Sequence, residues 1–454
     1  MMRAINPATG EVVSEHDEHS PGELERRLGL ASVAFEDFSR RSFDERASLM
    51  RRAAALFVEE REELARLMAD EMGKPVTQGL GEVDKCAAAM QYYAEHAPLF
   101  LADESVKTEA KKSFVAFRPL GAVLAIMPWN FPLWQVIRFA APALMAGNVG
   151  LLKHAANVPG CALAIERLFR KAGHPEGVFQ TLLIGQDAVG NVIDDARVAA
   201  VTLTGSTEAG RKVAARAGQA LKKVVLELGG SDPYVVLRDA DVAHAAAACV
   251  AARLVNAGQS CIAGKRFIVE RAVLGEFQQR FLEGMAKARV GDPRDPATEV
   301  GPLARVDLRD ALHRQVTQSV SRGARLALGG EMPGGRGAFY PPTVLLDVRP
   351  GMPAFDEETF GPLAAVVAAA DESEALGLAR SADFGLGAAV FTADRRRGES
   401  LAKDELFAGA CFVNAQVKSD VRLPFGGIKS SGYGRELGSF GIREFVNVKS
   451  VWID

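Results

Sequence analysis

Hydrophobic and polar positions divide the chain into a helical first third and a longer part in which strands alternate with helices. Two serines, Ser20 and Ser42, each precede a glutamate by three residues, a spacing typical of capping boxes at helix starts. An apolar stripe follows the first serine: Leu24, Leu28, Phe35 and Phe38. The second serine opens a predicted long helix that ends at Gly73-Lys74-Pro75, and a third helix is predicted over residues 81–100.

From about residue 113, short β-rich runs are separated by helical stretches. The predicted strands are GAVLAIMP (121–128), VGLLK (149–153), VFQTLLI (178–184), VAAVTLT (198–204) and VVLEL (224–228). A second series follows Gly229-Gly230, with YVVL (234–237), KRFIVE (265–270), AAVFT (388–392) and ACFVN (410–414). Strands that alternate with helices predict an α/β fold with parallel sheets and right-handed crossovers, here in two domains.

Two segments fall outside this alternation. The tail EFVNVKSVWID alternates like a strand but has no obvious partner nearby, so we expect its partner from elsewhere, including another subunit. The Gly-rich piece EMPGGRGAF (331–339) is typical of a surface loop.

Charge and composition narrow the classes of function. The 454 residues are 48% hydrophobic and 24% charged, and 54 Lys and Arg against 57 Asp and Glu leave a net charge of −3. This balance offers no basic face for nucleic acid, and no apolar run is long enough for a membrane span. The five cysteines are odd in number and lack C-x-x-C spacing, which favours a reducing compartment and gives no candidate metal site. Without an apolar leader, a cytoplasmic enzyme is expected.

Two turns are candidates for chemistry. Gly205 and Ser206 follow the strand VAAVTLT and open a helix, where backbone N–H groups can bind an anion such as a cofactor pyrophosphate. An ordinary β–α turn is the alternative. Cys261 ends the sequence Asn-Ala-Gly-Gln-Ser-Cys before a strand, where a thiol and its own N–H can meet a carbonyl. A buried structural cysteine is the alternative, and it suits the other four better.

Two further polar residues interrupt apolar segments. Glu227 stands at the end of the strand VVLEL, where an unused buried carboxylate would be costly and where α/β proteins place ligands. A local salt bridge is the alternative. Asn130 lies between two prolines directly after a strand, and its amide can donate to an oxygen. A simple turn residue is the alternative.

Together these segments resemble the aldehyde dehydrogenase superfamily over nearly the whole chain. The motifs that carry the resemblance are PWNFP (128–132), Lys153, TGSTEAG (204–210), LELGGSDP (226–233), NAGQSC (256–261), EETFGP (357–362) and PFGGIKSSGYGRE (424–436). The stretches IMPWNFPLWQVIR and LLKHA are similar to one bacterial branch, the short succinate-semialdehyde dehydrogenases that accept either nicotinamide cofactor.

The resemblance implies a catalytic set. Cys261 would attack the aldehyde carbon to form a thiohemiacetal, whose oxyanion would be held by Asn130 and the Cys261 N–H. Hydride transfer to the nicotinamide would leave a thioester. Glu227 would then act as the general base for its hydrolysis.

The resemblance also implies the cofactor site. Trp129 and Lys153 would line the adenosine side, and Gly205 and Ser206 would meet the pyrophosphate. Leu228 would contact the nicotinamide, Glu358 its ribose, and Phe360 would pack beside it, while Asn130 would also face the cofactor.

One departure concerns the choice of cofactor. Many relatives carry a glutamate that binds the adenosine ribose at the position of Ala156. Its loss removes a charge that would repel the 2′-phosphate of NADP, and Lys153, with His154 as a further candidate, would meet that phosphate. We therefore predict use of NAD or NADP; the alternative is only weaker adenosine binding.

The substrate is a separate expectation. Arg138 matches the arginine that holds the distal carboxylate in succinate-semialdehyde dehydrogenases, which implies oxidation of succinate semialdehyde to succinate. A surface arginine is the alternative, and a second family arginine is replaced here by Val255. Other small aliphatic or aromatic aldehydes, a thiol esterase using Cys261, a coenzyme A-acylating dehydrogenase and a non-catalytic scaffold are the competing functions.

The resemblance finally implies the domains and the assembly. Residues 1–103 and 120–228 would form the NAD(P)-binding domain, and residues 229–428 the catalytic domain. Residues 104–119 and 429–454 would form a small β element for bridging and oligomerisation, in a homodimer or homotetramer.

Overall fold

The computed structural model describes all residues from 1 to 454. Two serines begin the first long helices, as their spacing predicts. Ser20 Oγ accepts the Glu23 N–H at 3.2 Å at the start of α1 (Pro21–Phe38), although the Glu23 carboxylate contacts two arginines and leaves that box half formed. Ser42 and Glu45 form a complete capping box at the start of α2 (Phe43–Glu59).

The predicted long second helix is wrong, because the chain leaves helical geometry at Glu60 (φ −99°, ψ 18°) and continues as α3 (Arg61–Met72). Gly73 ends α3 in the left-handed conformation (φ 77°), as its position predicts. The third helix, α4 (Val76–Phe100), begins five residues earlier than expected. Gly79, a poor helix former, is kept in α4 because α3 approaches it within 3.1 Å of where a Cβ would stand.

The first large sheet has the strand order β19-β9-β8-β5-β6-β7, with only β19 antiparallel. Its chain order reverses at β5, which lies between β6 and β8, and ligand crevices form at such switch points. Its strands are β5 (Ala122–Met127), β6 (Val149–His154), β7 (Phe179–Thr181), β8 (Val198–Thr204), β9 (Lys223–Glu227) and β19 (Gly432–Tyr433). The helices that alternate with them are α5 (Trp134–Ala146), α6 (Pro159–Lys171), α7 (Gln186–Asp194) and α8 (Thr207–Gln219).

The second large sheet has the order β12-β13-β14-β11-β10-β16-β17 and is parallel except at its β12 edge. Its strands are β10 (Asp232–Val236), β11 (Gly264–Glu270), β12 (Arg325–Leu328), β13 (Thr343–Leu346), β14 (Leu363–Ala369), β16 (Gly387–Phe391) and β17 (Ala410–Val413). Strands β12 to β14 were not predicted. Its helices are α9 (Val242–Leu254), η1 (Val255–Gly258), α10 (Arg271–Lys287), α11 (Val306–Ser321), α12 (Pro353–Asp356), α13 (Glu372–Arg380), α14 (Arg395–Ser400) and η2 (Leu401–Glu405).

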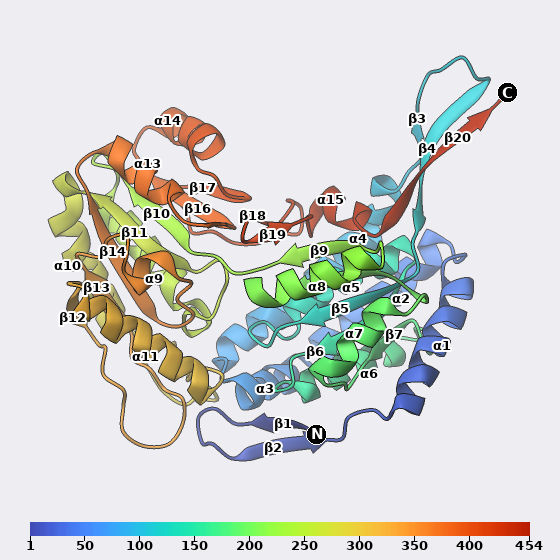
Figure 1. Ribbon diagram of the computed structural model, residues 1–454, viewed down its shortest axis with the longest axis horizontal. Helices are drawn as coiled ribbons and strands as arrows, with labels where there is room; N and C mark the ends of the chain where they lie inside the picture. The colour runs from blue at the N-terminus through green and yellow to red at the C-terminus, as the bar shows by residue number, and fades with distance from the viewer.

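A three-stranded antiparallel sheet projects from the body, with the C-terminus at its tip (Figure 1). This arm consists of β3 (Glu104–Ser105), β4 (Lys112–Pro119) and β20 (Val446–Ile453). The C-terminal strand pairs with β4 over eight residues, so its partner comes from elsewhere, as expected, and at this edge from the same chain rather than from another subunit. The pattern of neighbouring residues could not predict this pairing, because the two strands are more than 300 residues apart.

Small elements join the larger ones. They are the hairpin β1 (Met2–Ile5) and β2 (Val12–His16), the pair β15 (Phe384–Gly385) and β18 (Ile428–Lys429), and α15 (Gly438–Arg443). As predicted, residues 331–339 form no helix or strand and are mostly exposed. None of the helices combines the length and apolar character needed to cross a lipid bilayer.

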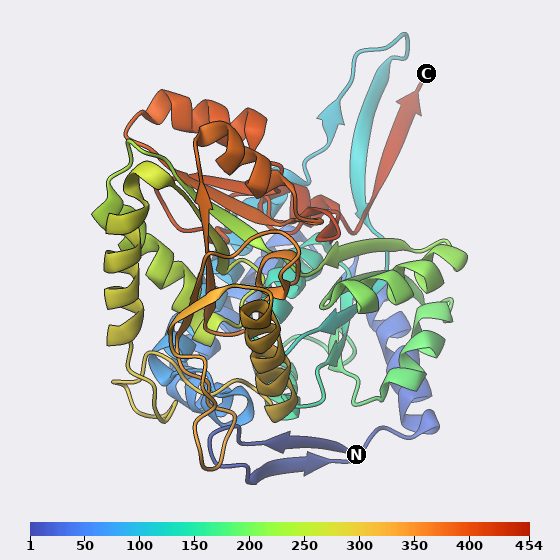
Figure 2. The same ribbon diagram turned by 60° about the vertical axis from the view of Figure 1, so that its left-hand side comes forward.

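Figure 2 shows the two large sheets as separate layers, each with its own helices. One hydrophobic core packs α1 to α6 against the first sheet, and two others cover the faces of the second. The α/β prediction with two doubly wound parallel-sheet units and a small β element is confirmed. The domain limits stay a prediction, and β19, inside the predicted bridging segment, joins the first sheet.

Candidate active site

Cys261 lies in the turn between η1 and β11, where the two large sheets face each other. Its side chain lines two separate cavities, one of about 130 Å³ and one of about 180 Å³. The smaller cavity is bordered by α5 and by residues 416–419, and the larger by the loops that follow β5 and β8. A thiol in this position can meet one ligand on each side.

The turn before Cys261 is strained. Asn256 (φ 51°) and Ala257 (φ 53°) are both left-handed, which costs about 1–2 kcal/mol for each residue. The Asn256 side chain compensates by donating to Asn130 O at 2.7 Å and to Gln259 O at 3.2 Å. Strain of this kind persists where the surroundings fix it, and here it determines how Cys261 is presented.

Asn130 reaches the turn from the loop after β5. Its Nδ2 donates to Gln259 O at 3.0 Å, and the side chain is buried with its Oδ1 unpartnered. An amide nitrogen carries two hydrogens, so one remains for an oxygen held in the cavity that Asn130 shares with Cys261. The N–H of Cys261 takes no part in the backbone hydrogen bonds of the turn. These are the two donors expected for an oxyanion.

The thiol itself is difficult to ionise. Burial raises the pKa of Cys261 to about 12, and the positive charges of Arg138 and Lys265 offset only part of that effect. Lys265 Nζ donates to Cys261 O at 2.7 Å, which fixes the backbone beside the thiol. Attack by this sulfur therefore requires removal of its proton.

Glu227 ends β9 in a buried environment. Neither of its carboxyl oxygens has a hydrogen-bond partner. Burial raises its pKa well above the usual range, and the nearby Glu436 adds to this while Arg138 opposes it. The carboxyl lies 2.6 Å from where a Cβ on Gly426 would stand, and it lines neither of the two cavities. A carboxyl so placed is a strong base once it ionises.

Arg138 lies on α5 and lines the smaller cavity. Its guanidinium is buried, forms an ion pair with Glu436 and stacks over Phe425 at 4.7 Å from the ring centroid. A further contact joins its Nη2 to Thr204 Oγ1 at 3.4 Å. The surface arginine considered from sequence is therefore wrong, whereas a role in holding a substrate carboxylate stays a prediction.

The larger cavity brings together most of the predicted cofactor residues. Among those that line it are Trp129, Asn130, Gly205, Ser206, Leu228, Glu358 and Phe360. The rings of Trp129 and Phe360 meet edge to face at 5.7 Å, and Ser206 caps α8 by accepting the Ala209 N–H at 3.2 Å. Glu358 accepts the Gly230 N–H at 3.0 Å and lies 3.7 Å from Lys265 Nζ. A helix start, two aromatic rings and a carboxylate thus face one cleft.

The adenosine side is less complete. Lys153 is the last residue but one of β6 and lines neither cavity. Burial lowers its pKa, and Glu18 is the charge that raises it. Ala156 is exposed. The suggestion that His154 meets a phosphate is wrong, because its ring is buried against Pro132 O at 2.8 Å and burial lowers its pKa to about 4. A neutral imidazole facing the core adds no charge to the cleft.

Several residues of the site were missed from sequence. Gln135 lines both cavities with its Oε1 unpartnered, and Glu436 contacts Arg138. Lys265 donates to the backbone carbonyl oxygen of Cys261. Three features of the sequence could have revealed them. Gln135 is a polar residue inside the apolar helix α5, Glu436 ends the motif PFGGIKSSGYGRE, and Lys265 follows Cys261 by four residues.

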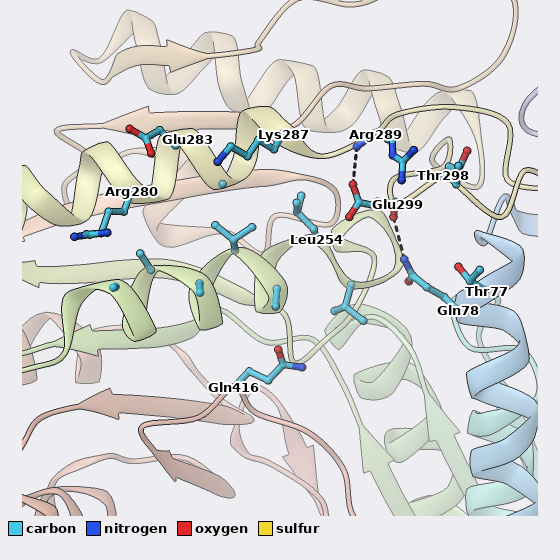
Figure 3. Close-up of a pocket in the computed structure, with 18 of the residues that line it drawn as sticks. Thr77, Gln78, Leu254, Arg280, Glu283, Lys287, Arg289, Thr298, Glu299 and Gln416 are labelled. Atoms are coloured by element: carbon cyan, nitrogen blue, oxygen red, sulfur yellow. Dashed lines mark hydrogen bonds between the residues drawn. The ribbon is translucent and has the colours of Figure 1, made fainter.

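A third, wider cavity of about 880 Å³ lies between α9 and α10 (Figure 3). It shares Val255 and Gln416 with the smaller Cys261 cavity. In Figure 3, Gln416 extends from the strand side toward this space, and Arg280 and Lys287 lie along α10. This space therefore adjoins the smaller Cys261 cavity.

Comparison with known proteins identifies the family to which this architecture belongs. The model of the aldehyde dehydrogenase family matches residues 1–451. The chain belongs to this family. A probable NADP(+) succinate-semialdehyde dehydrogenase of Synechocystis is 50% identical over 449 residues and 99% of both chains. An NAD(P)+ succinate semialdehyde dehydrogenase of Escherichia coli is 48% identical over 451 residues, 99% of this chain and 97% of its own.

A solved structure shares the fold at full length. The succinic semialdehyde dehydrogenase of Streptococcus pyogenes, crystallised with NADP+, aligns with a TM-score of 0.97, 35% identity and complete coverage of both chains. The resemblance inferred from seven motifs is therefore confirmed at the level of the family.

Proposed function

We propose that this protein oxidises succinate semialdehyde to succinate with NADP or NAD as the hydride acceptor. The observation that supports it best is Cys261 lining two cavities at once, one for an aldehyde and one for a dinucleotide. The relatives named for this activity cover the whole chain at about half identity.

The reaction begins when the Cys261 thiol loses its proton to solvent and the sulfur of the resulting thiolate forms a bond to the aldehyde carbon. The carbonyl oxygen takes the negative charge and is held by the free hydrogen of Asn130 Nδ2 and by the Cys261 N–H. A bound nicotinamide supplies the acceptor for the hydride that leaves this carbon. The carbon then remains attached to Cys261 as a thioester.

Hydrolysis requires a base near the thioester. Glu227 takes a proton from a water molecule whose oxygen bonds to the thioester carbon, and the C–S bond breaks to release the acid and the Cys261 thiolate. The carboxyl lies at the end of β9, outside both cavities, so it reaches this water by turning its side chain away from Gly426. Its raised pKa makes it a stronger base than an exposed carboxylate.

The residues of the cleft fit a nicotinamide dinucleotide. The start of α8 at Ser206 offers backbone N–H groups to a pyrophosphate, and Glu358 retains one oxygen for a ribose hydroxyl. Lys153 is a buried cation without a close counter-ion, and no carboxylate stands at Ala156 to repel a phosphate. These features support use of NADP as well as NAD. Strong exclusion of NADP in kcat/KM measurements would contradict this part.

The activity is tested by following the absorbance of reduced cofactor with a panel of aldehydes. We expect turnover with both cofactors, and the highest kcat/KM for aldehydes that carry a terminal carboxylate. Cys261→Ser should abolish turnover, while Cys411→Ser, a change at a cysteine of β17 outside both cavities, should leave it intact. Ester hydrolysis without cofactor reduction would instead indicate a thiol esterase.

We also propose that the protein is a cytoplasmic homodimer or homotetramer. The arm exposes apolar side chains on a free strand edge: Val448 is 62% and Trp452 55% exposed. Unpaired edges of this kind are usually covered in the assembled protein.

A further inference from the structure

The smaller Cys261 cavity is lined by cations and by no carboxylate. Its charged lining residues are Lys85, Arg138 and Lys418. Since cavities with one sign of charge concentrate ligands of the other sign, this side of the thiol favours an anion. The question is which cation is available to bind it.

Two of the three cations are poorly suited. The Arg138 guanidinium is already neutralised by Glu436 in a buried ion pair. Lys418 is exposed, so its charge is screened by water. Lys85 differs from both because its ammonium is held inside the cavity wall by neutral groups.

The contacts of Lys85 are defined. Its Nζ lies 2.6 Å from Ser419 Oγ and 4.1 Å from the centroid of the Trp134 ring. An ammonium has three donors, and Ser419 takes only one of them. The cation therefore has free hydrogens next to the cavity, on a side chain fixed by an aromatic face and a hydroxyl.

The acidic groups near Lys85 are occupied elsewhere. Glu82 pairs with the buried Lys74 and accepts the N–H groups of Leu133 and Trp134. Asp420 pairs with Arg422 at 2.6 Å. Burial and the neighbouring Arg138 lower the pKa of Lys85 to about 8, while Cys86, Glu82 and Asp420 act in the opposite direction. No carboxylate of the protein is therefore left to pair with the Lys85 ammonium.

We propose that Lys85, oriented by Ser419 and Trp134, binds the distal carboxylate of the aldehyde substrate and so determines the preference for carboxylate-bearing aldehydes. This inference rests on the proposed function. The assignment adds a specificity residue on α4, which no sequence motif had indicated. Arg138 then acts beside it by keeping Glu436 neutralised.

The test compares succinate semialdehyde with butanal, which has the same carbon chain but no carboxylate. Lys85→Met keeps an unbranched side chain, one atom shorter, and removes the charge. We expect kcat/KM for the semialdehyde to fall by about 10- to 100-fold, the value of a hydrogen bond to a charged group, while that for butanal stays near wild type. Lys85→Arg should keep most of the preference, because it keeps the charge.

Lys418→Met is the matched control, since it removes an equal charge from the same cavity wall. It should retain the preference for the semialdehyde. In the wild type, the ratio of the two kcat/KM values should decline as the pH rises through about 8 and beyond, because the ammonium loses its proton. In Lys85→Met this ratio should not change with pH.

Several results would overturn the assignment. They are an unchanged preference in Lys85→Met, an equal loss for both aldehydes, or an equal loss of preference in Lys418→Met. Failure of the proposed function gives a different result, because the wild type would then oxidise neither aldehyde with either cofactor. A wild type that oxidises butanal and rejects the semialdehyde would refute the proposed substrate and with it the role of Lys85.

Discussion

At Cys261 the residue type favours reaction with an aldehyde, while its surroundings oppose ionisation. A thiolate is the reactive form of cysteine, yet burial raises the pKa of this thiol to about 12. The Asn130 amide proposed as an oxyanion donor and the backbone support from Lys265 are nevertheless in place. The position of Cys261 therefore suits attack on an aldehyde, although its thiol is still protonated.

This gives a prediction for the protein without ligands. Alkylation of Cys261 by iodoacetamide should accelerate by about tenfold for each pH unit across the neutral and mildly alkaline range, because the thiolate fraction rises at that rate below the pKa. Peptide mass spectrometry measures the modified fraction. Cys249, buried inside α9, should stay unmodified in the same sample. A plateau near neutral pH would show that the thiol is already ionised.

The Glu227 carboxyl should make the reaction rate depend on pH. Burial raises the pKa of Glu227 well above its usual range, so the fraction of the carboxylate form, and with it the wild-type rate, should increase with pH. Glu227→Gln should lower kcat by about 10²- to 10⁴-fold and remove that rise. Rapid mixing should still show a burst of reduced cofactor, because the thioester forms but is not hydrolysed. A mutant without a burst would place the role of Glu227 before hydride transfer.

Among the elements, α4 links the core to the site. Its Glu82 accepts the N–H groups of Leu133 and Trp134 at 2.9 and 2.8 Å, which fixes the start of α5 directly after the Asn130 loop. The same carboxylate pairs with the fully buried Lys74. One helix thereby positions the loop that carries the proposed oxyanion donor, Asn130, and also presents Lys85 to the smaller Cys261 cavity.

Removal of this carboxylate should be costly. Glu82→Ala leaves the buried Lys74 charge uncompensated and two N–H groups unpartnered, so the free energy of unfolding should fall by about 3–5 kcal/mol. Urea denaturation followed by circular dichroism measures the change. Glu62→Ala, which breaks an exposed ion pair with Arg66, is the control and should change stability by no more than about 1 kcal/mol. Equal effects of the two substitutions would contradict the role given to the buried pair.

For the whole molecule, the arm of β3, β4 and β20 is the part that a single chain leaves uncovered. Val448→Lys combined with Trp452→Lys places two charges on its exposed face. If the arm joins subunits, the mass measured by light scattering should fall to the 48.5 kDa of one chain. Val33→Lys, at an equally exposed position on α1, should leave the assembly intact. A wild-type mass of one chain would contradict the proposed assembly.

Sequence periodicity was sufficient for most of the parallel strands, though not for β13 and β14, and for the starts of the helices that begin with Ser20 and Ser42, because their signals are local. Motifs next to the strands singled out Cys261, Asn130 and Glu227, and the first two line one cavity while Glu227 lies outside it. Their roles stay a prediction. Periodicity failed at the break near Glu60 and at the early start of α4, where packing between helices overrides propensity.

The sequence by itself determined the family, the fold class and the type of chemistry, because residue types and their order along strands specify these. Tertiary structure alone decided which charges are free. Arg138 is paired with Glu436, His154 faces the core, and Lys85 lines the smaller Cys261 cavity without a carboxylate partner. The physical reason is that neutralisation and burial depend on contacts between segments tens or hundreds of residues apart, and local pattern carries no record of them.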